Sequence, residues 1–203
     1  RERASLSFTD PMVNDTNNLL SGSLFYSFSG RSSMYYAPLD QITKGGSIRW
    51  GRRFKWPDDY FRGSWSFTAH QRSYEADSEE QLLLYTGGLK QTVGISVNQS
   101  ISRDSRDHPE FPTIGSLMAL SSNISGGPLG GNEDFHKHVL NLEWYTPTFW
   151  KFVLMSSLKI GGIKALPSND NERSMVPFNE RFIMGGSGMI YGNPLRGYED
   201  NRV

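Results

Sequence analysis

Polar and apolar side chains alternate with a period of two along most of this chain, and this pattern limits the possible folds more than any other feature. In residues 20–28, Leu24 and Phe28 fall on one face, whereas Ser23 and Ser27 fall on the other. Similar alternation occurs in residues 4–8, 47–54, 61–70, 92–98, 114–124, 140–144 and 150–160. Successive side chains of a β-strand point to opposite faces. The sequence therefore predicts an all-β, antiparallel fold of about eight strands.

The length of the predicted strands separates two classes of β protein. Most approach the ~10 residues of a membrane-crossing strand, whereas strands in soluble proteins are typically ~5–6 residues long. Tight turns, such as 55–59 and 146–148, also alternate with longer connections, such as 30–43 and 73–88. Outer-membrane barrels have short periplasmic turns and long extracellular loops. We therefore expect a transmembrane antiparallel β-barrel rather than a soluble sandwich or soluble barrel, with residues 73–85 forming an extracellular insert that can hold a short helix.

Composition excludes several functions. The 203 residues include 21 Lys and Arg and 21 Asp and Glu, so the net charge is zero, which argues against a nucleic-acid-binding surface. The absence of cysteine excludes disulfides, thiolate metal ligands and a thiol nucleophile. The mean hydropathy is −0.51, and no apolar run approaches the ~18 residues of a membrane-spanning helix. A β-barrel is compatible with these values because alternation hides its apolar content.

The last forty residues contain a series of short motifs. An aromatic and acidic segment leads into a glycine pair, and an Arg-Gly-Tyr tripeptide follows after a spacer. The residues concerned are Glu180, Phe182, Gly185, Gly186, Arg196, Gly197 and Tyr198. This order resembles the barrel of the BamA-type outer-membrane assembly factors and their relatives, the bacterial surface antigen family. In that family an F-x-E-x-F/Y segment, a Gly-Gly pair and an R-G-Y/F tripeptide follow one another, and residues 189–193 lengthen the spacer somewhat.

The resemblance extends over the whole chain. Residues 6–11 and the strand that follows are similar to the family's strand, Asn/Asp-Pro turn and glycine-containing next strand. Residues 104–116 resemble its D-x-x-D…P-T-x-G periplasmic turn, and residues 142–147 resemble the strand end before its shortest turn. The resemblance implies that residues 1–163 are middle strands of a barrel of about sixteen strands. Residues 164–203 would begin its long sixth extracellular loop, so we expect a fragment of a longer protein.

The resemblance also implies a role for the tripeptide. In the family the sixth loop folds back into the barrel lumen, and the arginine contacts acidic and aromatic groups on the inner wall. Arg196, Gly197 and Tyr198 would form the loop tip here, and the glycine pair would let the loop turn close to the wall. A guanidinium is always charged and offers a planar fork of donors to a carboxylate. Glu143, which faces the predicted lumen, is the candidate partner within the chain.

The function implied by the resemblance is the folding and insertion of other outer-membrane proteins in the bacterial outer membrane. Its partners would be unfolded outer-membrane proteins as clients, accessory assembly lipoproteins, outer-membrane lipid and lipopolysaccharide. We expect no enzymatic activity, cofactor, metal or nucleic acid. Two alternatives within the superfamily are a protein-translocation pore and the barrel of a patatin-like hydrolase. An alternative from a different class is a small independent outer-membrane barrel that acts as an enzyme or adhesin.

Other residues that can carry chemistry fit ordinary structural roles. His136 and His138 share a strand face, but the sequence offers no third metal ligand nearby. Ser187 lacks the second glycine of a G-x-S-x-G nucleophile elbow, because position 189 is methionine. Ser66 and His70 share a face, as an esterase pair would, but serine is common on lumen faces.

Arg49, Arg52 and Arg53 form a short basic group. They can line a basic lumen or bind the phosphates of lipopolysaccharide. Ordinary lumen electrostatics is the favoured interpretation for Arg49 and Arg53, which share the polar face.

Overall fold

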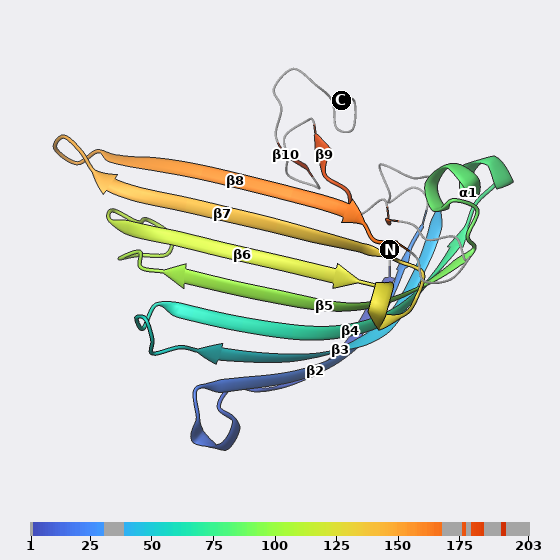
Figure 1. The fold of residues 1–203 in the computed structure, drawn as a ribbon, viewed down its shortest axis with the longest axis horizontal. Coiled ribbons are helices and arrows are strands. Elements are labelled where there is room, and N and C mark those ends of the chain that lie inside the picture. Colours follow the sequence, from blue (N-terminus) through green and yellow to red (C-terminus); the bar gives the residue numbers. More distant parts are fainter. Residues whose placement is uncertain (1, 31–38, 168–175, 178–179, 185–191, 194–203) are drawn as a thin grey trace.

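The computed structural model describes residues 2–30, 39–167, 176–177, 180–184 and 192–193. Eight strands form one antiparallel sheet, and each strand pairs with the next in sequence (Figure 1). The strands are β1 (Glu2–Asp10), β2 (Asn18–Ser29), β3 (Asp40–Arg53), β4 (Phe61–Glu75), β5 (Gln91–Asp104), β6 (Gly115–Ser125), β7 (Phe135–Pro147) and β8 (Val153–Ala165). Two short segments, β9 (Ile183–Met184) and β10 (Gly192–Asn193), pair in parallel. The all-β antiparallel prediction is confirmed.

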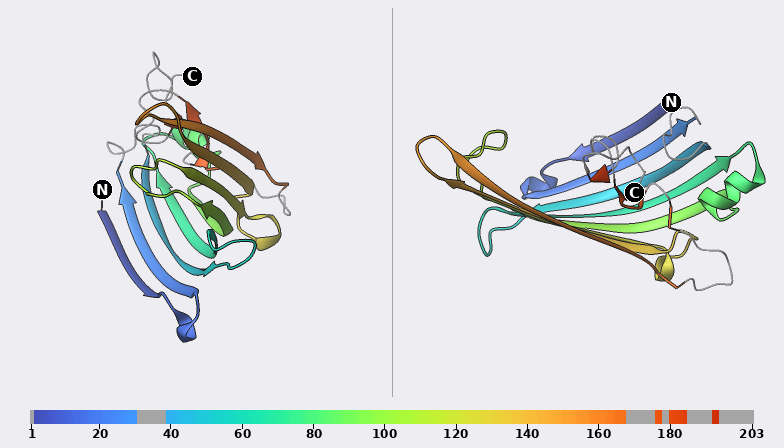
Figure 2. Two further views of the ribbon diagram at one scale, coloured as in Figure 1. Left: turned by 90° about the vertical axis from the view of Figure 1, so that its left-hand side faces the viewer. Right: turned by 90° about the horizontal axis from the view of Figure 1, so that it is seen from above.

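The sheet curves but does not close within the described residues. Strands β1 and β8 lie at its two edges, and each pairs with a single neighbour. Figure 2 shows the curvature, with β9 on the concave side. Closure into an eight-stranded barrel requires the first and last strands to hydrogen-bond. The open sheet therefore fits part of a larger barrel better than a small independent one.

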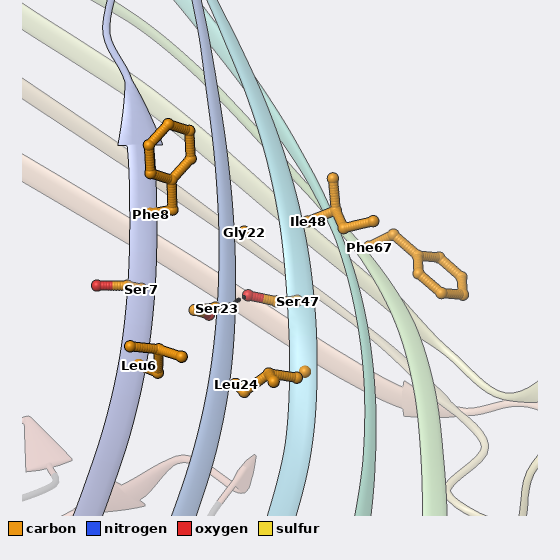
Figure 3. Close-up of a pocket in the computed structure, with 10 residues that line it drawn as sticks. Leu6, Ser7, Phe8, Gly22, Ser23, Leu24, Ser47, Ile48 and Phe67 are labelled. Carbon is orange, nitrogen blue, oxygen red and sulfur yellow. Dashed lines mark hydrogen bonds between the residues drawn. The ribbon is translucent and has the colours of Figure 1, made fainter.

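One face of the sheet is apolar, as the alternation predicts. Register places Leu6 opposite Leu24 and Ile48 opposite Phe67. The side chains of this face point outward from the sheet, and Leu6, for example, is 74% exposed. Figure 3 shows Leu6 and Phe8 on one side of β1. Together with Gly22 they help to line a hollow of about 650 Å³. A continuous apolar surface of this kind is stable against hydrocarbon rather than water.

The opposite face is polar and concave. It carries serine, threonine, asparagine, arginine and lysine side chains, and Ser23 Oγ lies 2.9 Å from Ser47 Oγ across β2 and β3 (Figure 3). We call the two sides of the sheet the apolar face and the polar face. In a barrel spanning a bilayer, the apolar face meets lipid and the polar face lines the lumen.

The two ends of the sheet differ. The short-turn end holds the connections 11–17, with the 3₁₀ turn η1 (Val13–Asp15), 54–60, 105–114 and 148–152, at the left of Figure 1. The long-loop end holds helix α1 (Glu79–Thr86) and the 3₁₀ turn η3 (Gly127–Leu129). Ser78 Oγ accepts a hydrogen bond from Gln81 N at the start of α1. The helix lies in the insert where the sequence allowed one.

The buried apolar cluster is small and lies at the long-loop end. Leu39, Tyr74 and Leu82 are buried together, with Ala76 and Tyr85 packed against them. In the part of the chain that the structure describes, no helix has the length and apolar character needed to cross a bilayer.

Candidate functional site

The segment after β8 contacts the polar face at Lys137. This lysine lies on β7, and its Nζ donates a hydrogen bond of 2.7 Å to the backbone oxygen of Glu180. The same Nζ lies 3.5 Å from Glu180 Oε2 and 5.0 Å from the centre of the Phe182 ring. An ion pair, a backbone hydrogen bond and a cation–π contact therefore meet at one ammonium group. We call this contact the loop anchor.

Gly161 on β8 completes the loop anchor. A β-carbon at this position would lie 2.5 Å from the Phe182 ring, so the ring lies directly on the strand backbone. Glycine within a strand often marks a site where another group approaches closely. Gly161 pairs with Val139 on β7, two residues beyond Lys137 on the same face. Lys137 and Gly161 were not predicted as site residues, although a glycine pair inside an alternating strand was a usable signal.

A local turn supports the loop anchor. Glu180 N donates to Pro177 O at 3.0 Å, and the Arg181 guanidinium donates to Val176 O at 3.1 and 3.3 Å. Pro177 is fully buried. These bonds hold Glu180 and Phe182 in position against the sheet.

The structure describes two of the seven residues of the predicted loop motif. Gly185, Gly186, Arg196, Gly197 and Tyr198 lie outside the described residues. Of the predicted loop motif, the structure thus positions Glu180 and Phe182. The assignment of the other five to a lumen-binding tip stays a prediction.

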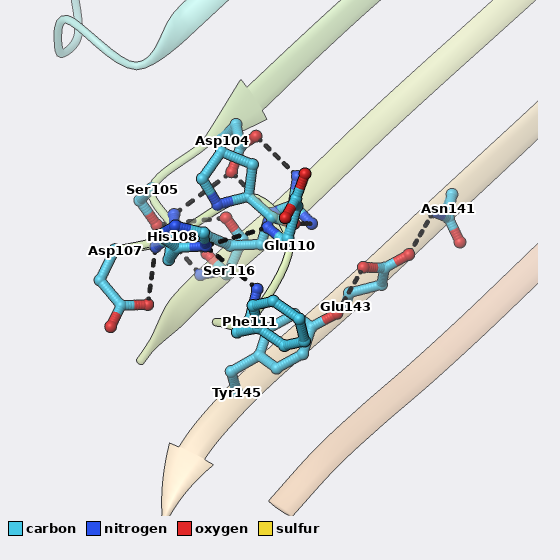
Figure 4. Close-up of polar contacts among 12 residues, drawn as sticks. Asp104, Ser105, Asp107, His108, Glu110, Phe111, Ser116, Asn141, Glu143 and Tyr145 are labelled. Carbon is cyan, nitrogen blue, oxygen red and sulfur yellow. Dashed lines mark hydrogen bonds and ion pairs between the residues drawn. The ribbon is translucent and has the colours of Figure 1, made fainter. Parts of the chain in front are cut away.

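Glu143, the predicted partner of Arg196, lies on the polar face of β7 near the short-turn end. Its carboxylate accepts hydrogen bonds from Asn141 Nδ2 at 2.9 Å and from Tyr145 OH at 3.0 Å (Figure 4). Six residues separate it from Lys137, about 20 Å along a strand. Glu143 is therefore remote from the loop anchor, and its pairing with Arg196 remains a prediction.

The predicted D-x-x-D…P-T-x-G turn closes around Asp107. The carboxylate accepts a hydrogen bond from His108 N at 3.0 Å (Figure 4). It also accepts hydrogen bonds from Thr113 N at 2.9 Å, Ile114 N at 3.3 Å and Thr113 Oγ1 at 2.5 Å. These donors, with the Thr113 hydroxyl the strongest, lower the pKa of Asp107. Arg106 forms two 2.9 Å bonds with Asp104 on the adjacent strand end. The turn is thus rigidly bonded, in keeping with a structural role.

A buried carboxylate that the sequence did not single out lies at the long-loop end. Glu133, in the β6–β7 connection, is 1% exposed. Arg72 Nη1 donates to its Oε2 at 2.7 Å, His70 Nε2 lies 3.1 Å from the same oxygen, and Thr92 Oγ1 donates to its Oε1 at 2.6 Å. Burial by itself raises the pKa of Glu133, but the bonds and charges of these three residues outweigh it and lower the pKa. His70 therefore binds Glu133, not Ser66.

The Glu133 cluster fastens the β6–β7 connection along β5. Val93 N donates to Asn132 Oδ1 at 2.8 Å, and Asn132 N donates to Val93 O at 3.0 Å. A β-carbon on Gly94 would lie 2.5 Å from His70 Cε1 and 2.6 Å from Glu133 Oε2. Glycine at this position therefore makes room for the cluster. The cluster joins β4, β5 and the β6–β7 connection.

No group of three potential metal ligands occurs among the residues that the structure describes. His136 and His138 lie side by side with ring centres 5.2 Å apart, and His138 Nδ1 contacts Ser122 Oγ at 2.9 Å. Register places both histidines on the same face as Leu140, which is the apolar face.

The fold and the loop anchor together are typical of one class of protein. Long antiparallel strands, an outward apolar face, a polar concave face and an inward-bonded loop are those of an outer-membrane β-barrel. Residues 1–203 match the model of the Omp85 superfamily domain, so the chain belongs to the Omp85 superfamily. It is accordingly an outer-membrane protein.

Two known proteins are similar to this chain in sequence. The outer membrane protein assembly factor BamA of Nitratidesulfovibrio vulgaris is 28% identical over 192 residues, which cover 92% of this chain and 22% of the relative. A SAM50-like protein of Schizosaccharomyces pombe is 24% identical over 226 residues, covering 100% of this chain and 40% of the relative. The chain thus spans well under half the length of these relatives.

A solved structure shows the same fold. The crystal structure of BamA from Haemophilus ducreyi lacking POTRA domains 1–3 superimposes with a TM-score of 0.78 at 18% identity. The match covers 99% of this chain and 38% of that chain. The eight-stranded open sheet therefore corresponds to part of a larger barrel.

Proposed function

We propose that this chain is part of the barrel of an assembly factor that folds and inserts other outer-membrane proteins. The names of the bacterial relative and of the solved structure support this activity. Unfolded outer-membrane proteins would be the clients, and accessory lipoproteins, membrane lipid and lipopolysaccharide the other partners. The short-turn end would face the periplasm. The chain itself would carry no enzymatic activity and need no cofactor.

The observation that supports this proposal most is the loop anchor. It precedes the Arg-Gly-Tyr tripeptide in the sequence, and it bonds Glu180 and Phe182 to the polar face. A loop held in the lumen by the Lys137 ammonium and by Phe182 stacked on Gly161 can stiffen one wall of the barrel. Stiffness in this wall would confine movement to other strands, where a client can add to an open edge.

The test is assembly of a client protein by the full-length protein in lipid vesicles. Lys137→Met removes the ion pair and the cation–π contact while keeping the length of the side chain. Lys159→Met is the matched control, because it removes a lysine from the same face of the neighbouring strand. We expect a several-fold slower folding of the client with Lys137→Met and an unchanged rate with Lys159→Met.

Three results would contradict the proposal. Equal client folding by protein-free vesicles and by vesicles that contain the wild-type protein would exclude assembly activity. Release of the client into the vesicle interior would indicate a translocation pore. Lipid hydrolysis by the full-length protein would indicate a hydrolase-linked barrel.

A further inference from the structure

Three arginines lie together on the polar face at the short-turn end. Arg49 and Arg53 are on β3, and Arg62 is on β4. Register places Arg53 directly opposite Arg62, and Arg49 opposite Ser66. Like charges directly opposite each other on neighbouring strands destabilise a sheet unless another group neutralises them. The arrangement thus has an energetic cost that a negatively charged group beside the arginines would offset.

None of the three arginines forms an ion pair with any residue that the structure describes. Arg53 Nε donates to the backbone oxygen of Asp59 at 3.0 Å, which leaves its charge uncompensated. The charge of Arg62 reaches Asp104, but that carboxylate is already held by the two bonds from Arg106. Three exposed guanidinium groups are therefore without a carboxylate of their own in the described sheet.

The arginines border a hollow of about 500 Å³. The hollow exists because Gly51, between Arg49 and Arg53, has no side chain and faces the short side chain of Ser64. Ser100 and Ser102 on β5 extend the floor. Serine hydroxyl groups and the Leu19 side chain line the floor, and guanidinium groups line the border. The hollow therefore suits an anionic ligand that also accepts hydrogen bonds.

We propose that this hollow binds the carboxylates of an extended, acidic polypeptide segment within the lumen. Arg49 and Arg53 are four residues apart on one strand, or about 13 Å. A single phosphate or carboxylate is too small to bridge that distance. An extended peptide along the strand has the same rise per residue, so two acidic side chains four residues apart meet both arginines. Guanidinium groups bind carboxylates through two parallel hydrogen bonds.

This site is separate from the loop anchor, which lies on β7 and β8 at the other end of the sheet. Peptide binding can be measured without client folding, so the two proposals fail independently. We assign the segment to an unfolded client, because the arginine spacing requires an extended chain and an unfolded client supplies one. In this assignment the inference rests on the proposed function.

The test is binding of fluorescent hexaglutamate to the full-length protein in lipid nanodiscs, with hexaglutamine as the neutral comparison. The variant is Arg49→Gln, Arg53→Gln and Arg62→Gln combined. Arg3→Gln is the control, because Arg3 lies on the same polar face, on β1, but outside the hollow. We expect hexaglutamate to bind the wild type and the control equally. The triple variant should bind roughly tenfold or more weakly, and added salt should weaken binding to the wild type.

The source of the segment is read from an added client. We expect an unfolded client with acidic segments to displace hexaglutamate from the wild type, and failure of the client to displace it would overturn the assignment. Wild-type affinity for hexaglutamate in the triple variant would overturn the proposal. Equal binding of hexaglutamine, or displacement of hexaglutamate by millimolar inorganic phosphate alone, would also overturn it. The variants must remain folded, which resistance to denaturation in unheated electrophoresis samples establishes.

Discussion

Glu133 carries its charge in a position from which water is excluded. Its side chain is 1% exposed, and a buried carboxylate is tolerated only when it is paired and hydrogen-bonded. Arg72, His70 and Thr92 supply those partners from β4 and β5. The cluster therefore fixes the position of the β6–β7 connection over the long-loop end of the lumen.

Removal of the charge at Glu133 should destabilise the protein. Glu133→Gln leaves Arg72 buried without a counter-charge, and breaking a buried ion pair in this way costs about 3–5 kcal/mol. Unfolding by urea in lipid vesicles measures the free energy of unfolding. Glu110→Gln, in an exposed turn, is the control and should change little. A loss below about 1 kcal/mol for Glu133→Gln would contradict the importance of the cluster.

The same cluster makes stability depend on pH. Because folding lowers the pKa of Glu133 below its ordinary value of 4.5, the contribution is complete above that pH. It is lost as the pH falls through the lower folded-state pKa. We expect the difference in unfolding free energy between wild type and Glu133→Gln to shrink as the pH falls below about 4.5. A difference that is constant across this range would contradict the assignment.

Two adjacent glycines on β8 give a matched test of the loop anchor. Gly161→Ala places a β-carbon 2.5 Å from the Phe182 ring, whereas a β-carbon on Gly162 meets nothing within 4 Å. We expect Gly161→Ala to displace Phe182 and to expose the peptide bond after Arg181 to trypsin. Gly162→Ala should resist cleavage as the wild type does. Equal cleavage of both variants would show that the ring does not depend on Gly161.

At the scale of elements, alternation carries the structural information. Each strand of 9–15 residues presents one apolar and one polar face, and the register keeps like faces together across the sheet. A shift of one residue would turn every apolar side chain of a strand to the lumen. Each strand is thus specified by its own sequence, together with the lipid that meets one face of the sheet and the water that meets the other.

Adjacent positions on β6 test which face meets lipid. Leu120 lies on the apolar face and Ser121 on the polar face, at the middle of the strand. A charged side chain facing lipid near the bilayer centre costs about 2–4 kcal/mol. We expect Leu120→Lys to lower the free energy of unfolding in vesicles by about this amount, and Ser121→Lys to change it little. Comparable losses at both positions would contradict the assignment of faces.

The eight strands, the antiparallel all-β fold class and the family could be predicted from the sequence, because each depends on local alternation or on a contiguous motif. It missed the loop anchor and the Glu133 cluster, because both depend on side chains from distant segments. Nothing near Glu133 in sequence shows that Arg72 and Thr92 will lie beside it. Lys137 likewise has an ordinary place in an alternating strand, and its contact with Glu180 arises from the path of the chain after β8.

At the scale of the whole molecule, an open, curved sheet with an apolar convex face is part of a barrel rather than a complete one. Its edges, β1 and β8, would leave unpaired hydrogen-bonding groups in lipid, which has no water to satisfy them. The chain spans 22% of the bacterial relative and 38% of the solved structure, which accords with this interpretation. The loop anchor would then join an extracellular loop to one half of the barrel wall.

The most direct test of this account is zero-length crosslinking of Lys137 to Glu180 in native outer membranes. A carbodiimide joins an amine to a carboxylate only when the two are in contact, and the structure places Nζ 3.5 Å from Oε2. We expect a crosslinked peptide pair that contains both residues, detected by mass spectrometry and absent from Lys137→Met. Modification of Glu180 without a link to Lys137, or a link to Lys151 at the short-turn end, would contradict it.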